Sequence, residues 1–131
     1  MYARHEQQLV NAILTLLTLK RIPHFHARNT GSVIRRRDGS LTFGKSMFTQ
    51  RGAPDIFAWK SLAGEIISTD HPVSLKLPHG TLRGYAIEVK SETGRVSPEQ
   101  KEWLDRFTAI GGVSIVARKL EDVAGPMGIP L

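Results

Sequence analysis

The chain contains no cysteine among its 131 residues. This absence excludes disulfides, thiolate zinc sites and cysteine nucleophiles. It also fits a reducing compartment, so we expect a cytoplasmic protein. Long apolar runs are absent too, because no stretch approaches the ~20 residues that a membrane helix requires. The polar opening stretch MYARHEQQ lacks the layout of a signal peptide.

Acidic residues are few, with 12 Asp and Glu against 18 Lys and Arg, which gives a formal net charge of +6. Such a balance favours polyanionic partners such as nucleic acids, although many basic proteins bind nothing specific. The length suits one compact domain over 1–131, and 40% hydrophobic residues suffice for a buried core.

Apolar periodicity and turn residues divide the chain into elements. Asp38-Gly39 is typical of a two-residue hairpin turn. Ser97, Pro98 and Gln100 form a capping-box start for a helix that ends at Gly111-Gly112. The predicted elements are a helix over 5–19, a short strand over 24–28, a hairpin over 33–43, a strand over 55–59, an inserted excursion over 60–83, a strand over 85–90, the capped helix, a strand over 113–117 and a last short helix starting near 120.

This order of elements predicts an α/β domain with a central mixed sheet flanked by helices. The strand–helix–strand unit over 84–117 should place its two strands parallel to each other.

Pro54-Asp55 and Glu88-Val89-Lys90 together form the pattern PD…ExK. Two carboxylates at the ends of neighbouring strands can bind Mg²⁺, and the backbone carbonyl of Val89 can add a third oxygen. Residues two apart on a strand share a face, so Lys90 would lie beside Glu88. There it could orient a water molecule or stabilise charge that develops on phosphate.

Asp, Glu and Lys are common, and a loose match of this kind arises by chance in on the order of a few per cent of chains. The context strengthens the match. Gln100 shares the apolar face of the capped helix with Trp103, Leu104 and Phe107, and that face should point toward the strand that carries Glu88.

The chain resembles the stand-alone VRR-NUC domains, the virus-type replication–repair nucleases of the PD-(D/E)XK superfamily. The matching residues are Arg28-Asn29-Thr30-Gly31, Gly52-Ala53-Pro54-Asp55-Ile56, Ala86-Ile87-Glu88-Val89-Lys90-Ser91, Gly94-Arg95, Ser97-Pro98-Glu99-Gln100 and Gly111-Gly112. The link between Asp55 and Glu88 is longer here than the family pattern has.

The resemblance implies a restriction-endonuclease-like core and phosphodiester cleavage that depends on Mg²⁺ or Mn²⁺. It implies that Asp55 and Glu88 are metal ligands, that Lys90 is the catalytic lysine and that Gln100 supports the site. Glu6, the acidic residue of the predicted first helix, would be an additional ligand. Stand-alone members look like archaeal Holliday-junction resolvases and tend to be homodimers.

Basic residues in the segments around the motif favour a groove that binds phosphates, although a charge run at a hairpin tip is as often a solvated turn. The candidate nucleic-acid contacts are Arg28, Asn29, Thr30, Arg35, Arg36, Arg37, Lys45, Arg51 and Arg95. His24 and His26 share one strand face, but without a third ligand they do not favour a zinc site.

Two functions are consistent with these patterns. The favoured one is a structure-selective DNA endonuclease that cuts four-way junctions by attack of a metal-activated water on phosphorus. The alternatives are a basic nucleic-acid-binding module without activity and a general nicking nuclease without junction preference. A former nuclease that now only binds nucleic acid would be expected to have lost Asp55, Glu88 or Lys90, and all three residues are present.

Overall fold

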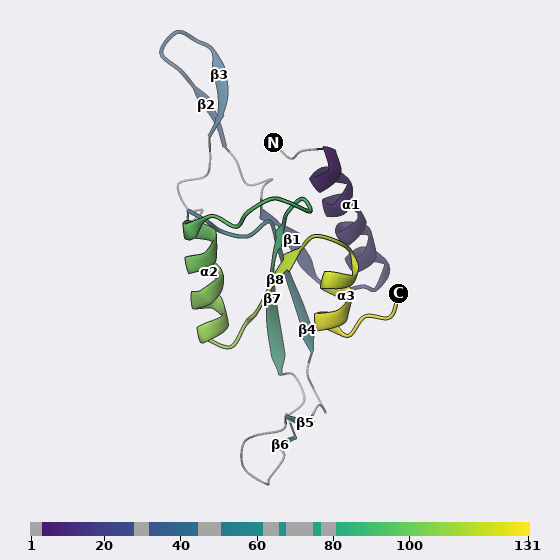
Figure 1. Ribbon diagram of the computed structural model, residues 1–131. Helices are drawn as coiled ribbons and strands as arrows, with labels where there is room; N and C mark the ends of the chain where they lie inside the picture. The colour runs from purple at the N-terminus through teal and green to yellow at the C-terminus, as the bar shows by residue number, and fades with distance from the viewer. Residues whose placement is uncertain (1–3, 28–31, 45–50, 62–65, 68–74, 77–80) are drawn as a thin grey trace.

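The computed structural model describes residues 4–27, 32–44, 51–61, 66–67, 75–76 and 81–131. The elements are α1 (Arg4–Leu19), β1 (His24–His26), β2 (Ser32–Arg35), β3 (Leu41–Gly44), β4 (Ile56–Ser61), β5 (Ile66–Ile67), β6 (Leu75–Lys76), β7 (Leu82–Val89), α2 (Pro98–Ala109), β8 (Val113–Ala117) and α3 (Glu121–Met127). Their order along the chain is visible in the colour ramp of Figure 1. No helix within these described ranges is long and apolar enough to cross a membrane.

A four-stranded sheet with the order β1-β4-β7-β8 forms the centre of the molecule. β4 pairs antiparallel with both β1 and β7, whereas β7 and β8 are parallel. The predictions of a mixed sheet and of a parallel pair joined through α2 are therefore confirmed.

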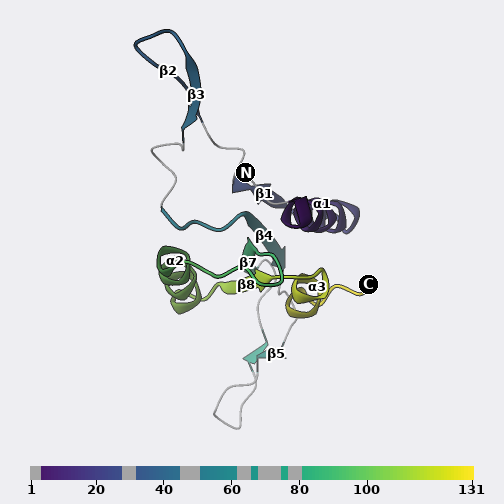
Figure 2. The same cartoon turned by 45° about the horizontal axis from the view of Figure 1, so that its top comes forward.

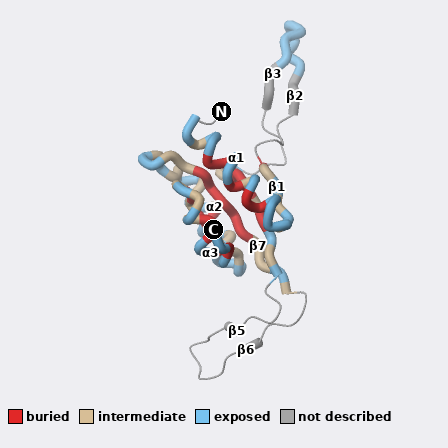
Figure 3. The backbone as a smooth tube through the Cα atoms, turned by 90° about the vertical axis from the view of Figure 1, so that its right-hand side faces the viewer, coloured by how far each residue is buried: buried red, intermediate tan, exposed pale blue. Residues whose placement is uncertain are grey.

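Helices cover both faces of this sheet, with α2 on one side and α1 and α3 on the other (Figures 1 and 2). Figure 3 shows that the buried residues run along α1 and the middle strands. The main core lies on the α1 and α3 side. Its largest fully buried side chains include Ile13, Leu17, Ile56, Ile87 and Met127. Because successive residues of a strand point to opposite faces, this core also determines which residues face α2.

The α2 side of β4 carries Phe57 and Trp59. The Phe57 ring meets Trp103 edge-on at a centroid distance of 5.4 Å, and Trp103 stacks on Phe107 at 5.3 Å. Trp103 and Phe107 thus pack against β4, and both side chains are half-buried. Ile110 does not join them, since α2 ends at Ala109 and the Ile110 side chain is 84% exposed.

The predicted hairpin forms, but its turn is longer than the expected two residues. Arg35 pairs with Leu41, and the Arg36 amide donates to the Ser40 carbonyl at 2.8 Å, which leaves three residues in the turn. Gly39 has a φ of +87°, as in a type I turn followed by a bulge. The Asp38 carboxylate accepts hydrogen bonds from the Ser40 hydroxyl and the Ser40 amide. These bonds favour the three-residue turn over a two-residue turn.

These two hydrogen bonds lower the pKa of Asp38 below its ordinary value, and the bond from the Ser40 hydroxyl has the larger effect. They therefore hold the turn while Asp38 is ionised and are lost as the pH falls through that lowered pKa.

The strands next to the motif begin and end at other residues than predicted. β4 starts at Ile56, so Asp55 immediately precedes the strand, and β4 continues to Ser61. β7 begins at Leu82 and ends at Val89. The two strands extend their ladder to the pair Ser61 and Leu82, which shortens the excursion. The described part of the excursion is a small antiparallel ladder between β5 and β6.

Candidate active site

Asp55 and Glu88 are the two buried acidic residues of the described fold, each only 1% exposed. The β4–β7 ladder ends at the pair Ile56 and Ile87, with Asp55 immediately before Ile56 and Glu88 immediately after Ile87. Since Ile87 belongs to the main core, Glu88 points to the other face, where it meets Gln100 of α2. The structure therefore places both buried carboxylates at the same end of the sheet, where β4 begins and β7 ends.

The backbone of Asp55 is held from both neighbouring strands. Its amide donates to the carbonyl of Ile87 at 3.1 Å, and its carbonyl accepts from the Ala27 amide at 2.7 Å. The carboxylate oxygen Oδ2 accepts the amide of Val89 at 2.7 Å. The side chain thus continues the sheet ladder at the point where β4 has not yet begun.

Two contacts of Glu88 are made at the same oxygen, Oε1. Gln100 Nε2 donates to Glu88 Oε1 at 2.8 Å, and Lys90 Nζ lies 3.5 Å from the same atom. The Lys90 side chain is 15% exposed, so its ammonium group lies at the edge of the buried site. Glu88 Oε2 is buried as well.

Gln100 links the first turn of α2 to Glu88. Its Oε1 accepts the Ser97 amide at 2.9 Å, while its own amide donates to Ser97 Oγ at 3.1 Å. This is the predicted capping box, with Pro98 in the first turn. Because the backbone amide of Ser97 requires an acceptor, the side-chain carbonyl faces Ser97 and the side-chain NH₂ faces Glu88.

Gly52 brings the segment before Asp55 against the start of α2. Its φ is +82°, and a Cβ at this position would lie 2.4 Å from the Glu99 carbonyl oxygen. Only glycine permits both this backbone conformation and this close approach. The glycine thereby joins the two segments that carry Asp55 and Gln100.

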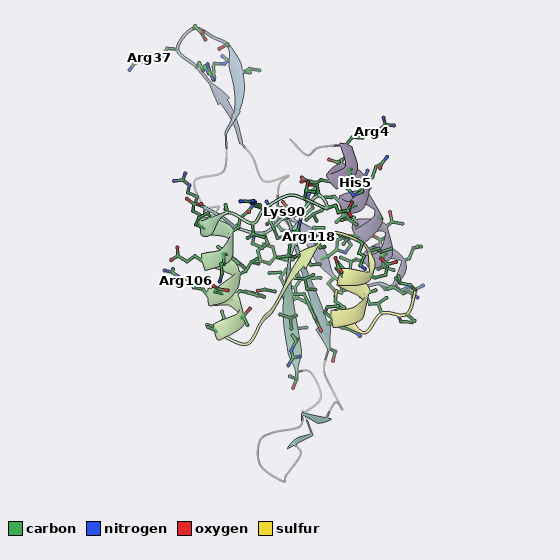
Figure 4. The ribbon with its side chains drawn as sticks, in the orientation of Figure 1. Arg4, His5, Arg37, Lys90, Arg106 and Arg118 are labelled. Carbon is green, nitrogen blue, oxygen red and sulfur yellow. The ribbon has the colours of Figure 1, made fainter. Side chains whose placement is uncertain are left out.

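Glu6 and Arg118 both contact the loop that follows Lys90. Glu6 Oε1 accepts the Ser91 amide at 3.0 Å. Arg118 Nη1 donates to the carbonyls of Ser91 and Gly94, each at 2.7 Å. Figure 4 shows Lys90 and Arg118 at the same end of the sheet as the start of α1.

Arg118 was absent from the sequence-based candidates. Its position directly after β8, which is parallel to β7, is the signal that could have indicated it.

The donor set fits a hard divalent cation. Two buried carboxylates supply oxygens, and the Val89 amide points toward Asp55. In an extended strand the amide and the carbonyl of one residue point to the same side, so the Val89 carbonyl is directed there too. Among the described residues, however, no three His, Cys, Asp or Glu side chains gather closely enough to hold a metal together. Glu6 thus does not form a three-carboxylate cluster with Asp55 and Glu88.

The predicted nucleic-acid contacts are spread over several places. Arg28, Asn29, Thr30 and Lys45 lie outside the described residues. Arg35, Arg36 and Arg37 are exposed on the β2–β3 hairpin, and Figure 4 shows Arg37 at its tip, well away from Lys90. Arg95 is exposed between Lys90 and the start of α2.

Arg51 lines a pocket of about 420 Å³ together with residues of α2. Trp103 and Phe107 form its apolar wall, and Arg106 lies at its edge in an ion pair with Glu102 at 2.7 Å. Of the two histidines of β1, His24 has its Nδ1 2.8 Å from the carbonyl oxygen of Ile22, and His26 pairs with Ile56, next to Asp55.

Comparison with protein-family models gives one match, the VRR-NUC domain, over residues 19–119. No curated protein and no solved structure matches the chain. The matched region contains the whole described sheet, including the buried pair Asp55 and Glu88. The chain therefore belongs to the VRR-NUC domain family and is a nuclease of the PD-(D/E)XK kind.

Proposed function

We propose that this nuclease is a metal-dependent DNA endonuclease that hydrolyses phosphodiester bonds in branched DNA, four-way junctions above all. The observation that carries the proposal is the pair of buried carboxylates, Asp55 directly before β4 and Glu88 near the end of β7, with Lys90 Nζ 3.5 Å from Glu88. A nuclease site requires such a set, because cation, phosphate and water must meet at one place.

Electrostatics support a cation at this position. Burying an ionised carboxylate costs roughly several kcal/mol of folding free energy, unless nearby charges and hydrogen bonds compensate for the lost hydration. Lys90 Nζ, 3.5 Å from Glu88 Oε1, supplies a positive charge beside the buried carboxylates, and a divalent ion would supply more. A divalent ion, Mg²⁺ or Mn²⁺, would be held by Asp55, Glu88 and the Val89 carbonyl. When bound, it would act as a Lewis acid that makes water a better nucleophile and offsets charge on phosphate.

The chain's own groups prepare the site before any ion binds. Gln100 and Val89 fix the orientations of the Glu88 and Asp55 carboxylates through hydrogen bonds of 2.8 and 2.7 Å. We assign Lys90 to the attacking water or to the charge that develops at phosphorus, because its ammonium group is the partly exposed member of the set. Glu6, on helix α1, would support the site indirectly by accepting the amide of Ser91, the residue after Lys90.

DNA binding would draw on the basic residues around this end of the molecule. The exposed Arg35, Arg36 and Arg37 sit on a hairpin that projects from the sheet and could follow a DNA arm. Arg51 and Arg95 flank the two motif segments, and we extend this assignment to Arg28, Asn29, Thr30 and Lys45. Contacts of this kind position DNA without reading its sequence, so the shape of the substrate would decide where the enzyme cuts.

The proposal is tested by incubating the purified protein with an end-labelled four-way junction and with a duplex of matched sequence. Each reaction contains Mg²⁺, Mn²⁺ or EDTA. We expect cleavage with either ion, no cleavage in EDTA and a faster rate on the junction. Cleavage that persists in EDTA would contradict metal dependence. Tight binding of both substrates without any cleavage would favour the binding module instead.

A further inference from the structure

The loop over residues 91–94 leaves the sheet directly after Lys90 and is held by Arg118. Arg118 Nη1 donates to the carbonyls of Ser91 and Gly94, both at 2.7 Å, and lies 3.3 Å from that of Glu92. The loop also closes on itself, since the Gly94 amide donates to the Ser91 carbonyl at 3.2 Å. One guanidinium group therefore contacts three backbone carbonyls of this turn.

Arg118 is itself fixed where β8 meets α3. Its amide donates to Asp122 Oδ2 at 2.9 Å, and the amide of Lys119 donates to the same oxygen at 3.2 Å. Just upstream, the Lys90 amide donates to the carbonyl of Ala117, the last residue of β8. The backbone on both sides of Arg118 is thus fastened.

The opposite side of the loop is held by α1, where Glu6 Oε1 accepts the Ser91 amide at 3.0 Å. The 91–94 loop therefore lies between a carboxylate from the first helix and a guanidinium from the last strand. Both contacts are made to the backbone, so they determine where the chain runs immediately after Lys90.

From these contacts we infer that Arg118 is a positioning residue that acts through Lys90. A residue at the end of a strand keeps its backbone direction only if the following turn is held. Here that turn sets how the Lys90 ammonium group reaches Glu88 Oε1. Arg118 uses its guanidinium inside the protein, so it differs from the exposed arginines that we assign to DNA. The inference rests on the proposed nuclease function.

The first experiment compares Arg118→Ala with Lys119→Ala, which removes the same charge from an exposed neighbouring side chain. We expect Arg118→Ala to lower the single-turnover rate between about 10- and 100-fold, as a small misplacement of a reacting group does. DNA affinity should change little. Lys119→Ala should cleave as the unmodified protein does. An Arg118→Ala variant that cuts normally per folded molecule would overturn the inference.

Salt dependence separates positioning from direct phosphate contact. Loss of one phosphate contact reduces the slope of log affinity against log salt by about 0.9. Arg118→Ala should leave this slope unchanged, and a reduction of that size would assign Arg118 to DNA instead. Arg118→Lys keeps a cation near the carbonyls and should restore part of the rate. Because lysine would also restore charge for DNA binding, the unchanged salt slope of Arg118→Ala is the result that separates the two roles.

A double variant tests whether Arg118 acts through Lys90. If it does, adding Arg118→Ala to Lys90→Ala should cost little further rate, because the group that it positions is already absent. Full additivity of the two losses would contradict the inference.

Hydrogen exchange provides a readout that needs no cleavage. In Arg118→Ala, the amides of Ser91 and Gly94 should exchange faster, while those in the middle of β7 keep their protection. If the unmodified protein cut no DNA, the proposed function would fail, yet exchange would still show whether Arg118 holds the loop. Unchanged exchange in the loop would show that Arg118 does not hold residues 91–94 in place.

Discussion

Asp55 combines a charge with a structural hydrogen bond. Its carboxylate is buried, and its Oδ2 accepts the amide of Val89, the residue after Glu88, at 2.7 Å. Substitution by alanine would remove both at once. The Val89 amide would lose its acceptor at a cost of about 1–3 kcal/mol, so a loss of activity could reflect a weakened fold. Asparagine separates the two, because it keeps a carbonyl oxygen of similar shape and loses the charge.

We predict that Asp55→Asn abolishes cleavage but melts close to the unmodified protein. Binding of junction DNA should be equal or tighter, because one negative charge near the phosphates has been removed. Single-turnover cleavage, thermal melting and a gel-shift titration in EDTA measure the three quantities. A variant that cut at the original rate would show that Asp55 is no part of the active site.

At the scale of elements, α2 contributes its N-terminus to the site through Gln100. One side chain completes the capping box with Ser97 and orients Glu88, so helix capping and site geometry are coupled. Glutamate at the same position can still accept from the Ser97 amide, and it is a preferred residue in a capping box. It cannot donate to Glu88.

Gln100→Glu should therefore keep the helix and lose activity. A second carboxylate beside Glu88 replaces a hydrogen-bond donor with a like charge, and we expect a cleavage rate at least about tenfold lower, from loss of a charge-assisted hydrogen bond worth roughly 1.5–3 kcal/mol. Circular dichroism checks the helix, and single-turnover kinetics give the rate. Glu99→Gln, an exposed neighbour in the same turn, is the matched control. Equal rates for both variants would remove Gln100 from the site.

The turn at Gly52 holds the Asp55 segment against the start of α2. Gly111 also has a positive φ, +103°, but a Cβ there would meet nothing within 4 Å. The two glycines therefore separate backbone strain from a steric clash. Strain alone costs about 1–2 kcal/mol for a residue with a Cβ.

We predict that Gly52→Ala lowers the melting temperature more than Gly111→Ala does. Only Gly52→Ala should also lower the cleavage rate per folded molecule, because its Cβ would displace the backbone at Glu99 and Gln100. Melting curves and single-turnover rates test this. Equal losses of stability in the two variants would mean that the start of α2 can move away from a Cβ at position 52 without a cost in folding free energy.

At the scale of the whole molecule, one chain presents one pair of buried carboxylates among its described residues. Resolving a four-way junction requires two cuts in strands related by a two-fold axis. A C₂ homodimer would supply two sites with that symmetry, and such dimers are the commonest oligomers. Each chain would add its formal charge of +6 to a shared basic surface.

We therefore predict a homodimer that cuts four-way junctions in preference to duplex. Light scattering measures the mass, and cleavage of matched substrates measures the preference. Higher salt should weaken duplex binding steeply and preserve more of the junction preference, since the latter depends on site spacing and on the deformability of the junction. A monomer at micromolar concentration that cuts both substrates equally would leave a general metal-dependent nuclease.

Several features follow from local physics and could be predicted from the sequence. The spacing of apolar residues predicts the first helix, and the Ser97–Gln100 capping box predicts the start of α2. The alternation of a strand places Glu88 and Lys90 on one face, whatever surrounds them. Mixed strand pairing followed from the order of elements. The length of the hairpin turn did not, because a side-chain contact between Asp38 and Ser40 selects it.

The tertiary structure alone decided how distant segments meet. Asp55 lies at the end of β7 because its amide and its carboxylate bond to the backbone of Ile87 and of Val89, which are distant in sequence. Glu6 and Arg118 meet at the 91–94 loop although 112 positions separate them in the chain, as their numbers give. Periodicity reports which face a residue occupies within its own element. It contains nothing about which backbone carbonyl a long side chain will reach, because that depends on how the helices and strands pack around the sheet.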